Sequence, residues 1–397
     1  MGEREVVIIG AGLGAVRVAQ QLRQRGHRGP ITVLGAEPHL PYDRPPLSKQ
    51  VLRGEADTTT YPDTDRLDVR WVLGTRAVSL DAARSKVLSE DGRAYGYDAL
   101  VLAPGGRART LPGLDVGSGV HVLRTIDDAL ALRAAIRASK RLIVIGAGFI
   151  GCEIAASARQ IGSDVDLIEV LPAPLIRVLG PAAASRVTDL HAAHGVRLHV
   201  EATVAAGVLR GSEGDVRGVQ LGDGTVLDGG DVVVGIGISP NVDWLTASGV
   251  ELQDGIVCDC SGRTSVPNIF ALGDAAQWWH ELAADHRRVE HWTTTADQAA
   301  VVAATITQDE TGAPAELRDA PYFWSDQYEI KIQGIGFIDP SDHVDELSIR
   351  DRPVLLYSRN GIVRGVVGFS IPAAVMRTKP LIERGAPVSD AIDLLTA

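Results

Sequence analysis

Two short glycine-rich turns have the residue types and the spacing that hold a dinucleotide. The first reads Gly10-Ala-Gly-Leu-Gly-Ala15 and the second reads Gly146-Ala-Gly-Phe-Ile-Gly151. In such a turn the first glycine permits a tight bend, the second lets the backbone approach a pyrophosphate, and a small third residue lets the helix pack on the strand. The helix then directs unpaired N–H groups at the phosphates. Because the motif occurs twice, we expect two bound dinucleotides.

One acidic residue follows each turn at a strand end, where a carboxylate can meet an adenosine ribose. These residues are Glu37 and Glu169, and each is expected to accept hydrogen bonds from ribose hydroxyls rather than to be merely solvated. A 2′-phosphate beside Glu169 would be repelled, by up to ~4 kcal/mol for unit charges about 4 Å apart at an effective dielectric constant of ~20. The sequence therefore favours NADH over NADPH, a preference that the nearby Arg177 could soften.

The segments around these turns form a repeated strand–turn–helix–strand unit. Apolar runs precede and follow each turn, with a helix-like stretch between them. Strands are expected at residues 4–9, 31–34, 141–145 and 165–169, and the helices are expected to end at residues 25 and 161. This is the βαβ unit of dinucleotide-binding domains. The expected fold class is α/β, with two Rossmann-type domains.

Composition limits the class of protein. A chain of 397 residues with 45% hydrophobic and 22% charged residues fits two or three globular domains. The 50 acidic residues outnumber the 39 basic ones, which gives a net charge of −11 and argues against a nucleic-acid or anionic-membrane binder. No apolar run approaches the ~20 residues of a membrane span, and the charged start is not a signal peptide. We expect a cytoplasmic protein.

The cysteines argue against thiol redox chemistry. There are only three, Cys152, Cys258 and Cys260, and no CxxC pair offers a dithiol or a zinc site. Cys152 falls in the second glycine helix and is expected to be a small buried hydrophobe. Cys258 and Cys260 are expected to share one face of a strand, which suits a disulfide poorly. No metal site is expected.

Further stretches, in a fixed order along the chain, carry a family resemblance. They include Pro41-Tyr-Asp-Arg-Pro-Pro-Leu-Ser-Lys49, Gly235-Ile-Gly-Ile-Ser-Pro-Asn241, Ala271-Leu-Gly-Asp274, Arg288-Val-Glu290 and Phe323-Trp-Ser-Asp-Gln-Tyr328. Essentially the whole chain resembles the FAD-containing, NADH-dependent ferredoxin reductases. The resemblance implies a glutathione-reductase-like architecture. It comprises an FAD-binding domain in two parts (residues 1–112 and 240–320), an NAD-binding domain (113–239) and a C-terminal α+β domain (321–397).

The resemblance also implies the residues that contact each cofactor, with FAD at the first turn and NAD at the second. The residues implied for FAD are Gly10, Gly12, Gly14, Ala15, Glu37, Arg44, Lys49, Ala77, Arg124, Asp274 and Trp292. Those implied for NAD are Gly146, Gly148, Ile150, Gly151, Glu153, Glu169 and Gly237. A helix that begins near Trp292 would direct its N-terminus at the flavin, although Thr294 and Thr295 depart from the family's usual Asn-Ala.

Three residues are implied for the chemistry: Lys49, Glu153 and Trp324. Lys49 is one of only five lysines, and the resemblance places it beside the flavin, paired with Glu153. A buried lysine needs such a partner to stay charged, and the pair is hypothesised to open when NADH enters. The alternatives are a surface lysine for Lys49 and simple packing for Trp324.

The implied activity is that of a flavoprotein that takes a hydride from NADH and passes single electrons to an iron–sulfur ferredoxin. That ferredoxin would feed a monooxygenase or a ring-hydroxylating dioxygenase. The alternatives are an NADH oxidase or peroxidase-type flavoenzyme and a redox-responsive binding flavoprotein. An acidic ferredoxin would need a local basic patch, for which the candidates are Arg107, Arg109, Arg288, Lys331, Arg377 and Lys379.

Overall fold

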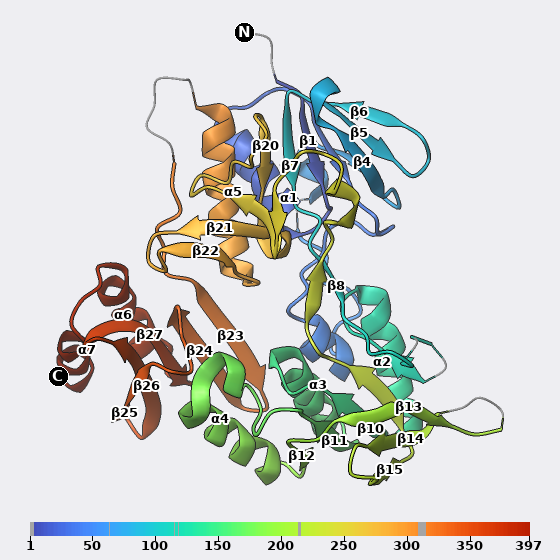
Figure 1. The fold of residues 1–397 in the computed structure, drawn as a ribbon, viewed down its shortest axis with the longest axis vertical. Coiled ribbons are helices and arrows are strands. Elements are labelled where there is room, and N and C mark those ends of the chain that lie inside the picture. Colours follow the sequence, from blue (N-terminus) through green and yellow to red (C-terminus); the bar gives the residue numbers. More distant parts are fainter. Residues whose placement is uncertain (1–3, 63, 115, 118, 213–215, 309–314) are drawn as a thin grey trace. The chain divides into compact units, whose positions relative to one another are not determined.

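The computed structural model describes residues 4–62, 64–114, 116–117, 119–212, 216–308 and 315–397 (Figure 1). They form two compact units, each assembled from separate stretches of chain. Unit 1 takes in the chain up to Asp43, Thr60–Arg107 and Pro240–Phe323, and unit 2 takes in Arg44–Thr59, Ala108–Ser239 and Trp324–Ala397. Three strands contain points at which the chain passes from one unit to the other: β8 (Gly106–Ala108), β17 (Ile238–Pro240) and β23 (Tyr322–Gln327).

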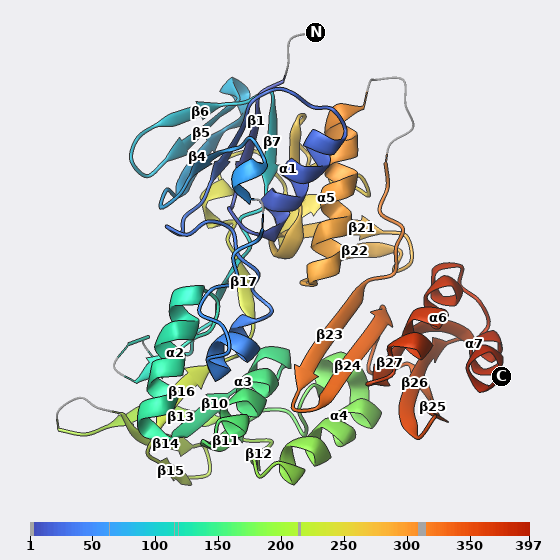
Figure 2. The ribbon, with the colours of Figure 1, turned by 180° about the vertical axis from the view of Figure 1, so that it is seen from behind.

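A five-stranded parallel sheet forms the centre of unit 1. Its first strand, β1 (Val6–Ile9), is buried along its whole length, as expected for a strand covered on both faces. Helices α1 (Leu13–Gln24) and α5 (Trp292–Thr307) pack side by side against it, as Figures 1 and 2 both show. The strand order is β20-β7-β1-β2-β3. The other strands are β2 (Ile31–Leu34), β3 (Arg70–Val72), β7 (Ala99–Leu102) and β20 (Ile269–Ala271).

Two smaller sheets also belong to unit 1. One is an antiparallel meander of β4 (Ala77–Asp81), β5 (Lys86–Ser89) and β6 (Ala94–Gly96). The other joins β18 (Leu252–Gln253), β19 (Gly255–Cys258), β21 (Ala276–His280) and β22 (Asp285–Arg288). Because β19 ends at Cys258, Cys260 lies beyond the strand, and the expectation that both thiols share a strand face is wrong. Cys260 belongs to the turn that follows.

The second βαβ unit lies at the centre of unit 2, again within a parallel sheet. The strand order is β12-β11-β10-β16-β9. A capping box of Thr125 and Asp128 starts α2, and Gly180 with Pro181 kinks α4. The strands are β9 (Val120–His121), β10 (Arg141–Ile145), β11 (Asp164–Ile168), β12 (Arg197–His199) and β16 (Asp231–Val234). The helices are α2 (Ile126–Ser139), α3 (Phe149–Gln160) and α4 (Ile176–Ala193).

Two antiparallel sheets follow in unit 2. The smaller consists of β13 (Val204–Arg210), β14 (Val216–Leu221) and β15 (Val226–Asp228). The larger has the order β23-β24-β27-β26-β25, and α6 packs against β24 and β27. Its further elements are β24 (Ile330–Gly336), β25 (His343–Ile349), β26 (Arg352–Arg359), β27 (Ile362–Phe369), α6 (Pro372–Glu383) and α7 (Val388–Thr396).

The expected elements are therefore present: two Rossmann-type sheets and a C-terminal region of sheet and helices. Strands β2, β10 and β11 lie within one residue of their expected bounds, and β1 begins two residues later than expected. The ends of β1 and β10 agree with expectation because a glycine follows each of them. The exact domain boundaries that the sequence suggests stay a prediction. None of the helices in the described residues combines the length and apolar character that a bilayer crossing requires.

Candidate functional site

The first glycine turn joins β1 to α1 in unit 1. A Cβ on Gly10, which has φ +102°, would lie 2.0 Å from the carbonyl oxygen of Ala103, so only glycine fits there. Around Gly12, by contrast, a Cβ would meet no atom within 4 Å. Ala15 is fully buried in the core. The backbone at Gly12 is thus open to a ligand, while Gly10 and Ala15 are closely packed, an arrangement that suits a pyrophosphate.

Glu37, the acid that follows β2, is held by a tyrosine of the Pro41–Lys49 motif. Tyr42 donates its hydroxyl proton to Glu37. The next residue, Asp43, accepts from Tyr61 Oη and from Trp292 Nε1, both at 2.8 Å. Trp292 is therefore fixed at the start of α5 by a residue of the specific motif. Burial and the adjacent carboxylate of Asp43 raise the pKa of Tyr61, so its hydroxyl remains a donor.

The N-terminus of α5 carries buried polar atoms that lack partners among the described residues. The hydroxyl of Thr294 and Nδ1 of His291 have no hydrogen bond there. Burial lowers the pKa of His291 to about 4, so this ring is neutral at pH 7. Orphaned polar atoms of this kind call for a polar ligand. Together with the open backbone at Gly12, they make unit 1 fit FAD, whose predicted contacts here also include Gly14, Ala77 and Asp274.

The remaining residues predicted for FAD are found in both units. In unit 1, Ala77 is buried in the hydrophobic core and Asp274 is half-buried in a short turn after β20. In unit 2, the guanidinium of Arg44 donates to the carbonyl oxygen of Arg124 at 2.5 Å. The structure thus brings Arg44 and Arg124 together, and their contact with FAD stays a prediction.

The second glycine turn joins β10 to α3 in unit 2. A Cβ on Gly151 would lie 1.9 Å from the carbonyl oxygen of Gly146, whereas one on Gly148 would meet nothing within 4 Å. Ile150, in the first turn of α3, is 45% exposed. Glu169 accepts the backbone N–H of Ala147 at 2.7 Å and that of Leu171 at 3.0 Å.

This second turn fits a second dinucleotide. The open backbone at Gly148 suits a pyrophosphate, and two backbone donors fix the carboxylate of Glu169 at the edge of the turn. Gly237, exposed after β16, adopts φ +95° with open space around it. The contacts of these residues with NAD stay predictions, because the structure gives only the protein's side of them.

Lys49 and Glu153 form the buried ion pair that the sequence suggested. Lys49 lies in a short π-helical turn, η1 (Leu47–Val51), and Glu153 lies in α3. Their Nζ and Oε2 atoms are 2.6 Å apart, with side chains only 6% and 3% exposed. The surface-lysine alternative is therefore wrong. Ser48 donates to Oε2 of Glu153 at 2.5 Å.

The C-terminal motif adds residues that the sequence did not single out. Ser325 donates to Oε1 of Glu153 at 2.7 Å, and Gln327 donates to Ser325 at 3.1 Å. His191, from α4, contacts Gln327 in turn. Trp324 is half-buried, with Lys331 Nζ 6.0 Å from its ring centre. Alternation along β23 could have flagged Ser325 and Gln327 as partners on one face, but nothing in the sequence pointed to His191.

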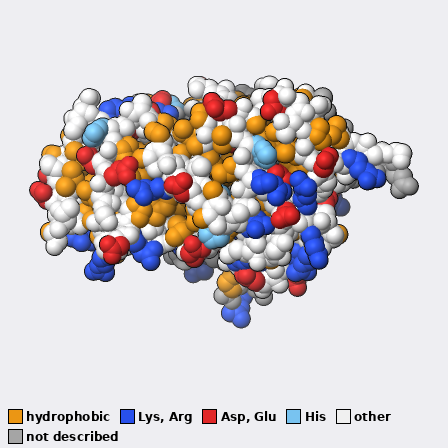
Figure 3. Space-filling model, turned by 90° about the horizontal axis from the view of Figure 1, so that it is seen from below, with side chains coloured by type: hydrophobic (Ala, Val, Ile, Leu, Met, Phe, Trp, Pro, Cys, Tyr) orange, Lys and Arg blue, Asp and Glu red, His pale blue; other side chains and the backbone are white. Residues whose placement is uncertain are grey.

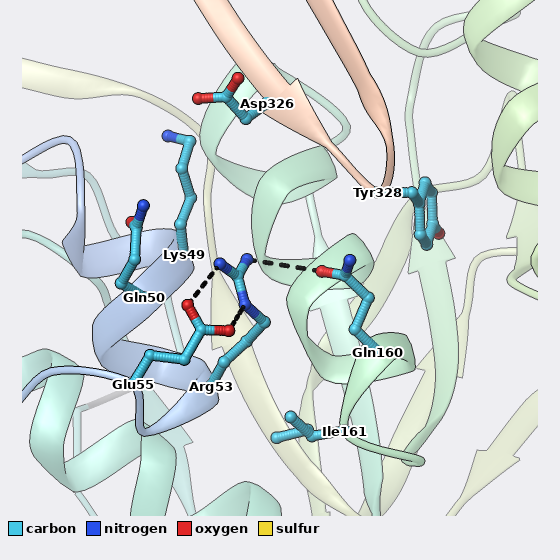
Figure 4. Close-up of a pocket in the computed structure, with 8 residues that line it drawn as sticks. All are labelled: Lys49, Gln50, Arg53, Glu55, Gln160, Ile161, Asp326 and Tyr328. Carbon is cyan, nitrogen blue, oxygen red and sulfur yellow. Dashed lines mark hydrogen bonds and ion pairs between the residues drawn. The ribbon is translucent and has the colours of Figure 1, made fainter.

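A pocket of about 530 Å³ reaches Lys49 within unit 2 (Figure 4). Lys49, Gln50, Arg53 and Glu55 come from η1 and the residues after it, and the opposite wall comes from the end of α3 and the β23–β24 hairpin. Arg53 is held by Glu55 at 2.6 Å and by Gln160 at 3.4 Å. Both signs of charge line the pocket, so it is not an anion site. It gives water a route to the lysine.

The basic residues suggested for a partner surface are mostly paired. Within the described residues, Lys331 lies 2.7 Å from Asp326 and Lys379 lies 3.4 Å from Glu383. Arg377 donates to a backbone carbonyl. Carboxylates also lie within ion-pair distance of Arg107 and Arg288. Basic and acidic side chains are interspersed on the face in Figure 3. The basic patch stays a prediction, and these contacts reduce its local charge.

Cys152, Cys258 and His199 have structural surroundings. Burial raises the pKa of Cys152 and of Cys258, which makes both poor nucleophiles. His199, Arg141 and Arg197 all contact the carboxylate of the buried Asp166. These partners hold the pKa of Asp166 at about 2. The described residues contain no cluster of three or more His, Cys, Asp or Glu that could hold a metal ion.

Comparison with known proteins agrees with this arrangement. The family model "Pyridine nucleotide-disulphide oxidoreductase" matches residues 4–299, and "Reductase C-terminal" matches residues 322–394. A ferredoxin–NAD(P)⁺ reductase of a Sphingomonas species is 36% identical over 96% of this chain and 93% of its own. The ferredoxin–NAD⁺ reductase component of the anthranilate 1,2-dioxygenase system of Burkholderia cepacia is 38% identical, over 83% and 81%.

A solved structure shares the whole fold. The crystal structure of the covalent putidaredoxin reductase–putidaredoxin complex matches with a TM-score of 0.92 and 31% identity, over 100% of both chains. The glutathione-reductase-like fold class, the oxidoreductase class and the cofactors FAD and nicotinamide nucleotide are thereby confirmed. The chain belongs to the FAD-dependent NADH:ferredoxin reductases, within the pyridine nucleotide-disulphide oxidoreductase family.

Proposed function

We propose that this protein takes electrons from NADH and delivers them singly to an iron–sulfur ferredoxin that serves a monooxygenase or a ring-hydroxylating dioxygenase. Bound FAD supplies the chemistry, since it accepts two electrons as a hydride and releases them one at a time. The ferredoxin acceptor follows from family membership. The residue roles and the terminal oxygenase are parts of the proposal. A cytoplasmic location is also part of it, because the donor NADH is a cytoplasmic metabolite.

The buried Lys49–Glu153 pair is the observation that carries the proposal. Glu153 lies in the helix that the second glycine turn begins, and Lys49 belongs to the motif that follows the first βαβ unit. Both residues belong to unit 2, where the pair connects the motif that follows the first βαβ unit to the helix of the second glycine turn. Lys49 also donates to the carbonyl oxygen of Pro45 at 3.1 Å. These contacts hold the ammonium in place.

Each predicted nucleotide region has its own set of residues in this proposal. Gly12, Glu37 and the N-terminus of α5 hold FAD in unit 1. Gly148 and Glu169 hold the nicotinamide nucleotide in unit 2. Glu169 also selects NADH, since a 2′-phosphate would meet a carboxylate already fixed by two backbone donors.

The test is a set of parallel assays on purified protein. The flavin content is measured first, then the rate of cytochrome c reduction by NADH with and without an added ferredoxin, together with oxygen uptake. We expect about one FAD per chain and cytochrome c reduction that depends on ferredoxin. Rapid oxygen uptake without ferredoxin would instead indicate an NADH oxidase. A long-lived complex with NADH and no reduction of any ferredoxin tried would indicate a redox-responsive binding protein.

A further inference from the structure

A row of buried hydrogen bonds extends from Glu153 to the tip of the β23–β24 hairpin. Oε1 of Glu153 accepts from Ser325 at 2.7 Å, and Oγ of Ser325 accepts from Gln327 at 3.1 Å. Oε1 of Gln327 lies 3.1 Å from Nε2 of His191, and Nδ1 of His191 lies 3.0 Å from Oη of Tyr328. The side chains of Ser325, Gln327 and His191 are completely buried. Polar groups so far from water are costly unless every one is satisfied.

We propose that Gln327 and His191 are positioning residues for Glu153, which they hold through Ser325 by a row of donors that all point toward the carboxylate. This inference deepens the proposed function, because it concerns the carboxylate of the Lys49–Glu153 pair. Neither residue touches the ion pair itself. Their effect reaches it through the hydroxyl of Ser325.

The ion pair of Glu153 with Lys49 fixes the direction of the row. A carboxylate only accepts hydrogen bonds, so Ser325 must give its one proton to Glu153. Gln327 must then present its NH₂ group to Ser325, which turns its carbonyl oxygen toward His191. The imidazole of His191 must therefore carry its proton on Nε2, and Nδ1 accepts the proton of Tyr328.

A further observation agrees with this direction. Burial lowers the pKa of His191 to about 4, so the ring is neutral at pH 7 and has one donor and one acceptor, as the row requires.

The row determines which way the carboxylate faces. Oε1 is held by Ser325, which leaves Oε2 for Lys49 at 2.6 Å and Ser48 at 2.5 Å. With donors on both oxygens, the carboxylate has a single orientation. Without the row, Glu153 can rotate about its terminal bond, and the Lys49 ammonium loses its partner for part of the time.

The experiment measures how reactive the Lys49 amine is in the flavin-loaded protein. The chain has only five lysines, so mass spectrometry after brief treatment with an acetylating reagent can quantify each of them. The pocket beside Lys49 admits a small reagent. Labelling of Lys49 is expressed relative to Lys86 and Lys140, which are exposed and serve as internal standards. KM and kcat for NADH are measured on the same samples.

We expect Gln327→Met and His191→Leu to raise Lys49 labelling at least threefold and to raise KM for NADH more than they lower kcat. His191→Gln, which keeps a donor near Nε2, should restore most of the wild-type labelling. His194→Leu is the matched control, because His194 stacks on Tyr328 with ring centres 3.6 Å apart but lies outside the row. It should leave Lys49 labelling unchanged.

Unchanged Lys49 labelling in Gln327→Met would contradict the proposal that the hydrogen-bond row positions Glu153. Changed labelling with an unchanged KM would support that proposal but contradict the role of Glu153 in nicotinamide binding. The two failures can therefore be told apart. A second measurement needs no folded variant. Nitrogen NMR of labelled histidines in the wild-type protein should show His191 protonated on Nε2, and protonation on Nδ1 would contradict the proposal.

Discussion

The two glycine turns differ most beside the phosphate-binding backbone. In unit 1 the position before the small third residue is Gly14, where a Cβ would come within 3.0 Å of Leu272 and 3.2 Å of Ala103. The equivalent position in unit 2 is Ile150, whose side chain is 45% exposed. The backbone is open around both Gly12 and Gly148, but position 14 is packed against its own unit and position 150 is exposed. The closer packing suits a cofactor that stays bound, and the exposed position suits a nucleotide that enters and leaves in each cycle.

The acids and the third small residues differ as well. Tyr42 holds Glu37 by a side-chain hydroxyl, whereas backbone N–H groups hold Glu169. The third small residue is Ala15 in the first turn, and in the second it is Gly151, where no Cβ fits. The second turn is therefore tighter and depends more on its own backbone. Substitutions should affect the two regions unequally.

The largest effect is expected from Gly151→Ala. The new Cβ would lie 1.9 Å from the carbonyl oxygen of Gly146, so α3 must move away from the turn. We expect KM for NADH to rise roughly 100-fold or more, about 3 kcal/mol, with the flavin content retained. The matched control is Ala15→Gly in the first turn, which should cost about 1 kcal/mol of stability or less. Loss of flavin with KM preserved would reverse the assignment of the two turns.

The second-largest effect is expected at the Lys49–Glu153 ion pair, because Glu153 lies in the helix that follows the second turn. Lys49→Met leaves Glu153 buried with only hydroxyl donors. Removing one partner of a buried ion pair typically lowers the free energy of unfolding by about 3–5 kcal/mol. We expect NADH-driven flavin reduction, followed by stopped-flow absorbance, to slow at least about tenfold (1.4 kcal/mol). Arg53→Gln is the control, because Arg53 lines the same pocket but pairs with the exposed Glu55. Equal rates for Lys49→Met and wild type would remove this role.

A medium effect is expected from acid, because burial lowers the pKa of His191 in unit 2 and of His291 in unit 1. Burial lowers both pKa values to about 4. Between pH 6.5 and 4 the unfolded chain binds protons that the folded one excludes, so stability falls as pH falls through this window. Each histidine should contribute about 2 kcal/mol of destabilisation between pH 7 and pH 5.

His191→Gln should remove the part of the acid-induced loss of stability that His191 contributes. The measurement is urea unfolding at pH 7 and at pH 5 for the variant and the wild type. If the two units unfold in separate transitions, only the one that reports on unit 2 should change. An identical pH dependence in both proteins would mean that His191 is charged or exposed in the folded state.

The smallest effect is expected at Glu37 and Glu169, the acidic residues that follow the two turns. Glu169→Gln removes the charge that a 2′-phosphate would meet, and the preference for NADH over NADPH, as the ratio of kcat/KM values, should fall about tenfold (1.4 kcal/mol). Glu37→Gln in the first turn should leave the ratio as it is. A change in the ratio with Glu37→Gln, or none with Glu169→Gln, would place the nicotinamide nucleotide at the first turn.

Local sequence signals were sufficient for the turns and for the elements that carry them. Glycine at positions 10 and 146 is required by backbone geometry, and the apolar runs before them can only be buried strands. The pairing of Lys49 with Glu153 came from resemblance, and the structure contains it. The partner patch was harder to predict, because charge on a surface depends on neighbours such as Asp326 beside Lys331.

The sequence alone determined that this chain carries two dinucleotide turns, each with its terminal acid, because the residues of a βαβ unit that define it are close neighbours along the chain. Only the tertiary structure decided what surrounds Glu153. Its partners come from η1, β23 and, through Gln327, α4, segments far apart in sequence. Hydrogen bonds act over about 3 Å, so the direction of donors around a carboxylate is set by which elements pack together.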